Sequence, residues 1–247
     1  MGHTAAVVLA AGQGTRMKSA RTKVLLDLGG QAVVKHVTDA CEGCGISRII
    51  VVVGTQADAV KTCLGSHFEY AHQAHTRGTA DAVKCAVPLL TGFTGRLVVI
   101  PGDAPLVTAE TLEQLLQVHG SRKQAATVLT AVLADGAAYG RIIRDEENLV
   151  VRIVERKVAR KGELEIREVN SGVYCFEAEQ VLPLLDEIEE NPVSGEYYLT
   201  DIVGILVDRG YEVLGLRAAD PRVMLGVNTP EDLNKVRDIM RERMQQE

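Results

Sequence analysis

The sequence predicts an α/β fold in which a mixed, mainly parallel β-sheet is flanked by helices. Short β-branched runs alternate with segments of helical spacing through the first half of the chain. The chain has no Trp and 3 Phe, so its core must be built from Val, Leu, Ile and Ala, as is common where helices pack on a parallel sheet. Its 247 residues are enough to bury a substantial core.

In the first half of the chain, the predicted strands and helices follow one another in a regular order. The predicted buried strands cover residues 5–10, 48–54 and 96–103. The predicted helices cover residues 31–45, 79–90 and 108–120, the last beginning with a Thr/Glu capping pattern and ending on a glycine. This alternation is typical of βαβ units and therefore indicates parallel strands.

The rhythm changes in the second half. A strand is predicted over residues 125–134, a hairpin over 140–157, a strand followed by a helix over 169–188, a late strand over 211–218 and an amphipathic helix at the end. Pro230 suits the first turn of that last helix. We therefore expect one mixed-sheet domain over residues 1–229, a lobe inserted around 135–200, and a C-terminal helix over 230–247.

Composition excludes several classes of partner. The formal net charge of −6 argues against a polybasic nucleic-acid or membrane binder, because both partners demand a broad positive field. The 5 cysteines are an odd number without a disulfide framework, and no apolar run reaches the length of a membrane span. We expect a cytoplasmic protein that binds neither nucleic acid nor membranes, with a monomer as the default state.

Residues 7–25, "VVLAAGQGTRMKSARTKVL", concentrate positive charge beside two glycines. Glycines after a strand let the backbone N–H groups approach an anion, so the turn favours a phosphate ligand. The Walker pattern is absent, and the dinucleotide pattern fails at Met17. The remaining hypothesis is a nucleoside triphosphate loop in which Arg16 and Lys23 converge on phosphate oxygens, with Lys18 and Arg21 facing solvent. The alternative is that all four are ordinary surface charges after a turn.

Six further segments make a resemblance specific. The glycine-rich stretch resembles the L-A-A-G-x-G-T-R-M-x(5)-P-K-x-L signature of the sugar-phosphate nucleotidyltransferases. The other matching segments are "QAHTRGTADAV", "PGDAPLV", "YGRIIR", "EVNSGVY", "GEYYLTDIV" and "LGVNTPEDL", in the same order. Together they resemble the uridyltransferase domain that begins certain bifunctional enzymes. The resemblance covers nearly the whole chain and implies a Rossmann-like nucleotide-diphospho-sugar transferase fold whose inserted lobe binds the sugar.

The resemblance also implies substrates and site residues. The substrates would be UTP and N-acetylglucosamine 1-phosphate, the cofactor Mg²⁺, and the product UDP-N-acetylglucosamine, a precursor of peptidoglycan and lipopolysaccharide. Arg16 and Lys23 would be catalytic, and Asp103 and Asn228 would hold the metal. The nucleotide would contact Leu9, Ala10, Ala11, Gly12, Gly14, Gln73, Gly78, Thr79 and Gly102. The amino sugar would contact Gly140, Glu155, Asn170 and Thr200.

These assignments make chemical sense. Asp103 follows a predicted strand, where ligands of open α/β sheets bind, and a carboxylate with an amide oxygen suits Mg²⁺. Gln73 can offer a donor and an acceptor to a pyrimidine. No Ser/His/Asp or Cys/His constellation appears, and a sugar phosphate needs no general base because its second pKa is about 6. The expected reaction is in-line attack of that phosphate on the α-phosphorus of the triphosphate, with loss of pyrophosphate.

Three departures from the family pattern bear on these expectations. Thr22 stands where a proline usually precedes the motif lysine, which predicts a looser loop. Pro101 stands where the bifunctional enzymes often have Tyr, which weakens assignments at that edge of the pocket. The sequence stops after one helix, before the hexapeptide repeats of a left-handed β-helix acetyltransferase domain, so acetylation is not expected.

Three alternative functions remain. The same reaction class could use another pair, such as dTTP or CTP with a different sugar phosphate. A nucleotide-sugar sensor without turnover is disfavoured by the intact pair of predicted metal ligands. A dinucleotide-dependent oxidoreductase is disfavoured by the failed glycine fingerprint.

Overall fold

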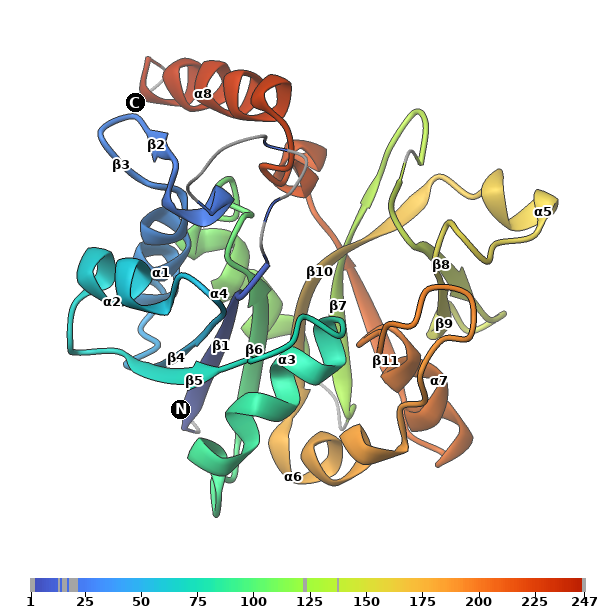
Figure 1. Cartoon of the computed structure of the whole chain (residues 1–247). Helices are drawn as coiled ribbons and strands as arrows, with labels where there is room; N and C mark the ends of the chain where they lie inside the picture. Colours follow the sequence, from blue (N-terminus) through green and yellow to red (C-terminus); the bar gives the residue numbers. More distant parts are fainter. Residues whose placement is uncertain are drawn as a thin grey trace.

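The computed structural model describes residues 3–12, 14, 17, 22–121, 124–136 and 138–245. Within these residues, nine strands form one sheet in the order β11-β7-β10-β6-β1-β4-β5, with the β8–β9 hairpin attached through β10. Figure 1 shows the sheet running through the molecule with helices on both faces. The strands are β1 (Thr4–Ala10), β4 (Arg48–Val53), β5 (Glu69–His72), β6 (Arg96–Pro101), β7 (Ala126–Val132), β8 (Arg141–Arg144), β9 (Val150–Val154), β10 (Glu168–Glu177) and β11 (Val213–Arg217). A separate pair joins β2 (Asp27–Leu28) to β3 (Gln31–Ala32).

The sheet is mixed, as the sequence predicts. β1 lies parallel to both β4 and β6, so that Leu9 is level with Val52 on one side and with Pro101 on the other. β5 extends this parallel half beyond β4. β10 runs antiparallel to β6 and β7, while β11 is parallel to β7. The carboxyl ends of β1, β4, β5 and β6 therefore meet at one edge of the sheet, where open α/β folds bind ligands.

β10 connects the main sheet with the lobe. Its pairing with β7 is interrupted between Asn170 and Tyr174, and before that interruption Val169 also pairs with Arg141 of β8. In Figure 1, β10 runs continuously from the sheet toward the β8–β9 hairpin. One strand therefore carries residues into both halves of the molecule, which fixes the lobe next to the carboxyl edge of the sheet.

The helices cover the sheet with apolar side chains. They are α1 (Val33–Gly43), α2 (Ala57–Leu64), α3 (Thr79–Ala86), α4 (Ala109–His119), α5 (Lys161–Leu164), α6 (Ala178–Val181), α7 (Asp201–Asp208) and α8 (Pro230–Met244), with 3₁₀ turns η2 (Lys23–Leu25), η3 (Val87–Leu90), η4 (Leu182–Glu187) and η5 (Pro221–Met224). Val7 packs in a cluster with residues of α3 and α7, whereas Val8 packs in a second cluster with residues of α1 and α4. This alternation along β1 is the two-residue period of a strand buried on both faces.

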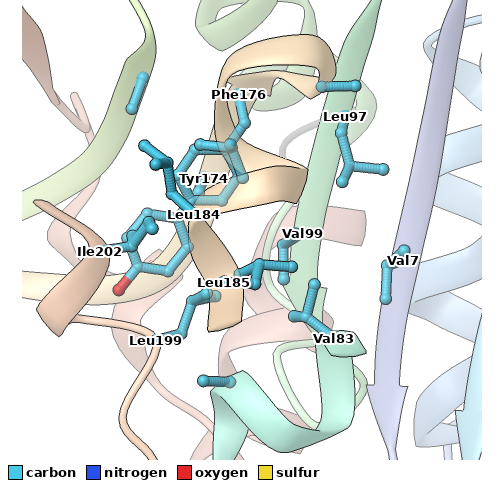
Figure 2. Close-up of a cluster of buried hydrophobic side chains, with 14 of the residues drawn as sticks. Val7, Val83, Leu97, Val99, Tyr174, Phe176, Leu184, Leu185, Leu199 and Ile202 are labelled. Carbon is cyan, nitrogen blue, oxygen red and sulfur yellow. The ribbon is translucent and has the colours of Figure 1, made fainter. Parts of the chain in front are cut away.

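The first of these clusters carries the aromatic rings of β10 (Figure 2). Tyr174 and Phe176 stack with ring centroids 5.2 Å apart, and both are buried among aliphatic side chains such as Leu185 and Ile202. Most of the core is Val, Leu, Ile and Ala, as the composition predicts. The described helices include none that is long and apolar enough to cross a membrane.

Some elements differ from the prediction, each for a local reason. The helix predicted over residues 79–90 becomes 3₁₀ after Ala86, because Pro88 has no backbone N–H to continue the α-helix. The helix predicted at the end of the segment 169–188 also changes type. It is an α-helix only up to Val181 and then continues as the 3₁₀ turn η4, which contains Pro183. β5 was not predicted: it is the edge strand, so its side chains are mostly part-exposed and lack a continuous apolar run. α2 and α7 were also missed, although both are amphipathic helices of 8 residues.

Candidate active site

A cavity of about 570 Å³ lies at the carboxyl edge of the parallel strands, between the main sheet and the lobe. Its volume is in the range of small-molecule sites, roughly 300–1,000 Å³. Twelve of the residues implied by the family resemblance line it: Leu9, Ala11, Gly12, Gly14, Lys23, Gln73, Gly78, Thr79, Asp103, Glu155, Asn170 and Thr200. The fold therefore brings the predicted nucleotide and sugar residues to one cavity.

Four of the predicted residues do not line the cavity but lie next to residues that do. Ala10 points into the core on the other face of β1, because its side chain alternates with that of Leu9. Gly102 donates its N–H to the carbonyl of Leu9 at 2.9 Å, and Gly140 accepts a hydrogen bond of the same length from the N–H of Asn170. Asn228 adjoins the cavity through Lys23. The predicted catalytic residue Arg16 lies outside the described residues, as do Lys18 and Arg21.

Lys23 joins the two predicted metal ligands. Its ammonium forms an ion pair with the carboxylate of Asp103 and donates a 2.8 Å hydrogen bond to the amide oxygen of Asn228. The side chains of Lys23 and Asp103 are 16% and 15% exposed, so this contact is largely shielded from solvent. Oxygen atoms of both residues therefore point at one cation, which in this structure is the lysine's own ammonium.

The start of α8 positions Asn228 next to Asp103. Thr229 caps the helix by accepting from the N–H of Asp232, and the Asp232 carboxylate accepts in return from the N–H of Thr229 at 2.9 Å and of Asn228 at 3.2 Å. The N–H of Val227 donates to the carbonyl of Asp103 at 2.9 Å. A capping box and one main-chain hydrogen bond thus bring together two residues that are distant in sequence.

Thr22 makes two hydrogen bonds at the end of the glycine-rich segment, whereas the expectation that its departure from proline loosens the loop falls mostly on residues outside the described ones. Its N–H donates to the side-chain oxygen of Gln56 at 3.0 Å, a bond that proline cannot make. Its hydroxyl donates to the carbonyl of Gly12, also at 3.0 Å. The two bonds connect the residue before Lys23 to the end of β1 and to the start of α2. Within the described residues, the loop is held at this point by groups that a proline would lack.

The predicted nucleotide residues Gly78 and Thr79 are next to the segment 197–199. The N–H of Ala80 donates to the carbonyl of Tyr197 at 3.0 Å, and the Thr79 hydroxyl accepts from the N–H of Leu199 at 2.9 Å. Gly78 has a φ of +112°, and a Cβ at that position would lie 2.3 Å from the carbonyl oxygen of Tyr197. Only glycine permits this approach, so Gly78 serves packing between two chain segments as well as the cavity.

The side of the cavity that holds the predicted sugar residues carries a half-buried carboxyl group. Glu155 accepts a 3.2 Å hydrogen bond from the hydroxyl of Thr200. Burial raises the pKa of Glu155 above its ordinary value, although the bond from Thr200 acts in the opposite direction. Burial also raises the pKa of the adjacent Asp201. A half-shielded carboxylate of this kind is well suited to accept hydrogen bonds from sugar hydroxyl groups, because it has few competing donors.

Asn170 is oriented by its neighbours on β10. Its amide nitrogen donates to the Tyr174 hydroxyl at 2.7 Å, and its amide oxygen accepts from the N–H of Gly172 at 2.9 Å. Tyr174 also lines the cavity, so its ring belongs to the core while its hydroxyl belongs to the site. Tyr174 was not predicted as a site residue although it ends the matched segment "EVNSGVY", because a tyrosine inside an apolar strand equally fits a core residue.

Several other lining residues were also missed. They are Val24, Thr76, Ala82, Pro101, Gly172, Glu196, Tyr198 and Leu199. All of them lie inside segments that match the family pattern, so membership in those segments was the available signal. Pro101 lines the cavity opposite Gly172, whose Cβ would lie 3.0 Å from the proline ring. Gly172 has a φ of +79°, so the chain passes this ring in a conformation that favours glycine.

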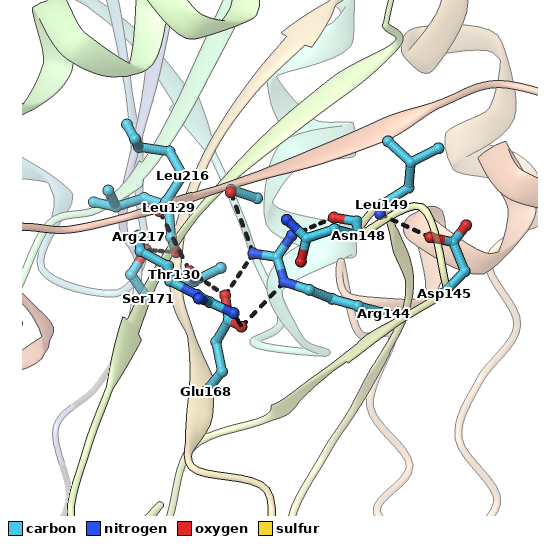
Figure 3. A network of polar contacts seen from close by, with 11 residues as sticks. Leu129, Thr130, Arg144, Asp145, Asn148, Leu149, Glu168, Ser171, Leu216 and Arg217 are labelled. Atoms are coloured by element: carbon cyan, nitrogen blue, oxygen red, sulfur yellow. Dashed lines mark hydrogen bonds and ion pairs between the residues drawn. The ribbon is translucent and has the colours of Figure 1, made fainter.

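An ion-pair cluster around the buried carboxylate of Glu168 joins the lobe to the sheet (Figure 3). Glu168 of β10 pairs with Arg144 of β8 and, at 2.8 Å, with Arg217 of β11. Thr130 of β7 donates to the same carboxylate at 2.7 Å. Burial alone would raise the pKa of Glu168, but these hydrogen bonds outweigh it and lower the pKa to about 2. Glu168 lies two residues before Asn170, so the cluster stabilises the strand that carries a predicted sugar-binding residue.

The side-chain oxygens of Asp103 and Asn228 fit a cation that takes only a few of its ligands from the protein. No cluster of three or more His, Cys, Asp or Glu side chains suited to a metal occurs in the part of the chain that the structure describes. Mg²⁺ does not require one, since it keeps several waters and is bound through one or two protein oxygens together with substrate phosphates. The ammonium between the two side chains shows that both oxygens can face the same positive charge.

Comparison with known proteins adds independent information. Residues 6–157 match the family of MobA-like NTP transferase domains. The bifunctional protein GlmU of Brevibacillus brevis is 47% identical over 239 residues, which are 97% of this chain and 52% of that protein. GlmU of Bacillus subtilis is 44% identical over the same length, again 97% of this chain and 52% of that protein. The chain thus spans about half the length of the curated relatives it matches.

A solved structure supports the fold. The crystal structure of a Bacillus anthracis protein described as a glucose-1-phosphate thymidylyltransferase superposes with a TM-score of 0.80 over 96% of this chain and 95% of that one. Its sequence identity is 21%, so the likeness shows the architecture alone. Fold, cavity and relatives agree: this chain belongs to the MobA-like NTP transferase domain family and is a nucleotidyltransferase of the type found in bifunctional GlmU proteins.

Proposed function

We propose that this chain transfers a uridylyl group from UTP to N-acetylglucosamine 1-phosphate, giving UDP-N-acetylglucosamine and pyrophosphate. The observation that carries the proposal is one cavity that adjoins the nucleotide residues on one side and the lobe residues on the other. The GlmU relatives, 47% and 44% identical over nearly all of this chain, support the choice of substrates.

The proposed reaction is one displacement at phosphorus. An oxygen of the sugar phosphate forms a bond to the α-phosphorus of UTP, and the bond from that phosphorus to the oxygen bridging the β-phosphate breaks. The electron pair leaves with pyrophosphate. No proton must be removed from the nucleophile, because a phosphate monoester with a second pKa of about 6 is largely a dianion near neutral pH. Alignment and charge neutralisation are then the work of the protein.

Each group at the cavity has a role in this proposal. Gly12 and Gly14 bring the backbone close to the triphosphate, and Lys23 neutralises its negative charge. Glu155 and Asn170 orient the sugar from the lobe. Arg16 would join Lys23 at the phosphates, although it lies outside the described residues. The reacting oxygen and the α-phosphorus meet between these two sets of contacts.

Mg²⁺ is part of the proposal. Asp103 and Asn228 would hold it, and when bound it would neutralise phosphate charge and orient the triphosphate. Because Lys23 pairs with both of these side chains, its ammonium must turn toward the phosphates when the metal is bound. Lys23 is thus the counter-ion of Asp103 when the site is empty and the counter-ion of the substrate phosphates when metal and substrate are bound.

The experiment that tests the proposed function is pyrophosphate release across a matrix of nucleoside triphosphates and sugar 1-phosphates, with and without Mg²⁺. The expected result is release with UTP and N-acetylglucosamine 1-phosphate that requires the metal. Release with a different pair alone would assign another nucleotidyltransferase reaction. No release with any pair, from protein whose fold is verified by circular dichroism, would contradict catalysis and favour a nucleotide-sugar sensor.

A further inference from the structure

The amide of Gln73 is held in one orientation by its neighbours. Its nitrogen donates to a carboxylate oxygen of Asp81 at 2.8 Å and to the carbonyl oxygen of Gly78 at 3.2 Å. Both partners are acceptors only, since an ionised carboxylate and a backbone carbonyl have no proton to give. The reverse orientation would place the Gln73 oxygen against two other oxygens. The two contacts therefore fix which end of the amide is the nitrogen.

This orientation determines what Gln73 offers to a ligand. The amide nitrogen has two hydrogens, and one goes to each of the two partners. Gln73 lines the cavity, and none of the described residues donates a hydrogen bond to its side-chain oxygen. The oxygen is thus the amide atom left for a ligand. Although glutamine in general can serve as donor or acceptor, at this position it serves as an acceptor.

Asp81 is placed so that it can impose this choice. It is on the first turn of α3, and both it and Gln73 are buried, at 8% and 4% exposure. Its second carboxylate oxygen accepts from the guanidinium of Arg77 at 2.7 Å, which gives the carboxylate a counter-ion. The main-chain N–H of Gln73 donates to the carbonyl of Val53 at 2.9 Å, which joins the residue to the end of β4.

We propose that Asp81 sets the base specificity of the site by holding the Gln73 carbonyl oxygen toward the cavity as an obligate acceptor. The inference rests on the proposed function, in which the nucleotide is UTP. In a uridine nucleotide the base has one hydrogen-bond donor, the ring N3–H, so the acceptor must meet that group. Cytosine has a lone pair at N3 instead, and in the same position it would face the Gln73 oxygen without a proton between them. The site therefore selects the imide edge of uracil or thymine against cytosine.

The test measures equilibrium binding of UTP and CTP by isothermal titration calorimetry, which does not depend on turnover. In the Asp81→Asn variant, the new amide oxygen accepts from Arg77 and its nitrogen can donate to the Gln73 oxygen, so the Gln73 amide can turn over and present its nitrogen to the base at the expense of its contact with Gly78. We expect the ratio of UTP to CTP affinity to fall by about 10- to 100-fold, the usual discrimination from one mismatched buried hydrogen bond. Wild-type protein should also bind 3-methyl-UTP, which lacks the N3 proton, at least about 10-fold more weakly than UTP.

A matched variant separates orientation from charge. Arg77→Gln removes the ion pair with Asp81 but leaves the bond from Gln73 to Asp81, so it should keep the wild-type ratio of UTP to CTP affinity. Circular dichroism and the unfolding temperature check that each variant is folded. If folded Asp81→Asn keeps the wild-type ratio, or if Arg77→Gln lowers the ratio as much, the inference is overturned. Either result leaves pyrophosphate release from UTP by the wild-type protein untouched, so failure of the inference and failure of the proposed function are distinguishable.

Discussion

Lys23 donates a 2.8 Å hydrogen bond from its ammonium to the amide oxygen of Asn228, a residue 205 positions later in the chain. The bond joins η2 to the residue before the N-cap of α8, and the same ammonium pairs with Asp103, two residues after the end of β6. The Lys23 ammonium thus holds together the segments that carry Lys23, Asp103 and Asn228. A triphosphate that draws Lys23 away would leave two oxygen ligands facing each other, ready for a divalent cation.

Removing the Lys23 ammonium should separate catalysis from metal binding. Lys23→Ala is expected to lower the rate of pyrophosphate release by two orders of magnitude or more, about 3 kcal/mol of lost transition-state stabilisation. Without triphosphate, the same variant should bind Mn²⁺ more tightly than wild type in electron paramagnetic resonance titrations, because no internal cation competes for Asp103. Lys235→Ala on the exposed face of α8 is the control and should change neither quantity. A Lys23→Ala rate within a few-fold of wild type would contradict the assignment.

Replacing Thr22 tests the anchoring of the glycine-rich loop. Thr22→Val removes the hydroxyl bond to Gly12 and keeps the N–H bond to Gln56. The free energy of unfolding should fall by about 1 kcal/mol, the usual contribution of one hydrogen bond, and the KM for the triphosphate should rise several-fold. Thr22→Pro, which loses both bonds but is stiffer, distinguishes rigidity from hydrogen bonding. If the proline variant matches wild type in KM and stability, the two bonds do not anchor the loop.

The Glu168 cluster predicts a pH-dependent stability. Because the pKa of Glu168 lies near 2 in the folded protein against an ordinary value of 4.5, its contribution is complete above pH 4.5 and is lost as the pH falls toward 2. Glu168→Gln should lower the unfolding free energy at neutral pH by roughly 2 kcal/mol, since it leaves the buried Arg144 without its counter-ion. Urea titrations at several pH values should show a shallower acid decline in this variant.

The Glu168→Gln variant should also change substrate binding. Since Glu168 stabilises the strand that holds Asn170, its loss should raise the KM for the sugar phosphate more than the KM for UTP. Glu146→Gln, in the exposed turn of the β8–β9 hairpin, makes the same charge change in the lobe while touching no cluster residue, and should leave stability and both constants unchanged. Equal changes in the two KM values would show that the cluster supports the whole protein rather than the lobe.

Gly78 should not tolerate a side chain. In Gly78→Ala, the new Cβ meets the carbonyl oxygen of Tyr197 at a position that also has positive φ, so the unfolding free energy should fall by at least about 2 kcal/mol and UTP affinity should drop. Gly45→Ala is the matched control, because Gly45 has a φ of +83° but a Cβ there would meet nothing within 4 Å. Thermal unfolding of both variants separates backbone strain from steric conflict. If Gly78→Ala and Gly45→Ala lower the unfolding free energy equally, the contact with Tyr197 is unimportant.

Much of the fold follows from the sequence because its signals are local. The strands β1, β4 and β6 are short runs of buried β-branched residues, and the start of α8 carries both a capping box and a proline. The edge strand β5 gave no such signal, because an edge strand needs no continuous apolar run. The proline-containing 3₁₀ turns were predicted as parts of α-helices, because side-chain spacing alone does not distinguish α from 3₁₀ geometry.

The sequence predicted which residues belong to the candidate site better than it predicted the contacts between them. Motif resemblance placed Asp103 and Asn228 in one group, but the main-chain hydrogen bond from Val227 to Asp103 that brings them together follows from neither motif. The hydrogen bond from Thr22 to Gln56 was not predicted, because its partner lies 34 residues later in the chain. Ala10 was assigned to the nucleotide together with its neighbours, yet the period of a strand turns it away from Leu9.

The most direct test of uridylyl transfer follows the α-phosphate itself. Wild-type protein is incubated with UTP labelled with ³²P at the α-position, N-acetylglucosamine 1-phosphate and Mg²⁺, and the products are separated by chromatography. Direct displacement predicts that all transferred label appears in UDP-N-acetylglucosamine, that an equal amount of unlabelled pyrophosphate is released, and that no label stays on the protein. Label in pyrophosphate or on the protein, or UTP recovered unchanged, would contradict a direct displacement by the sugar phosphate.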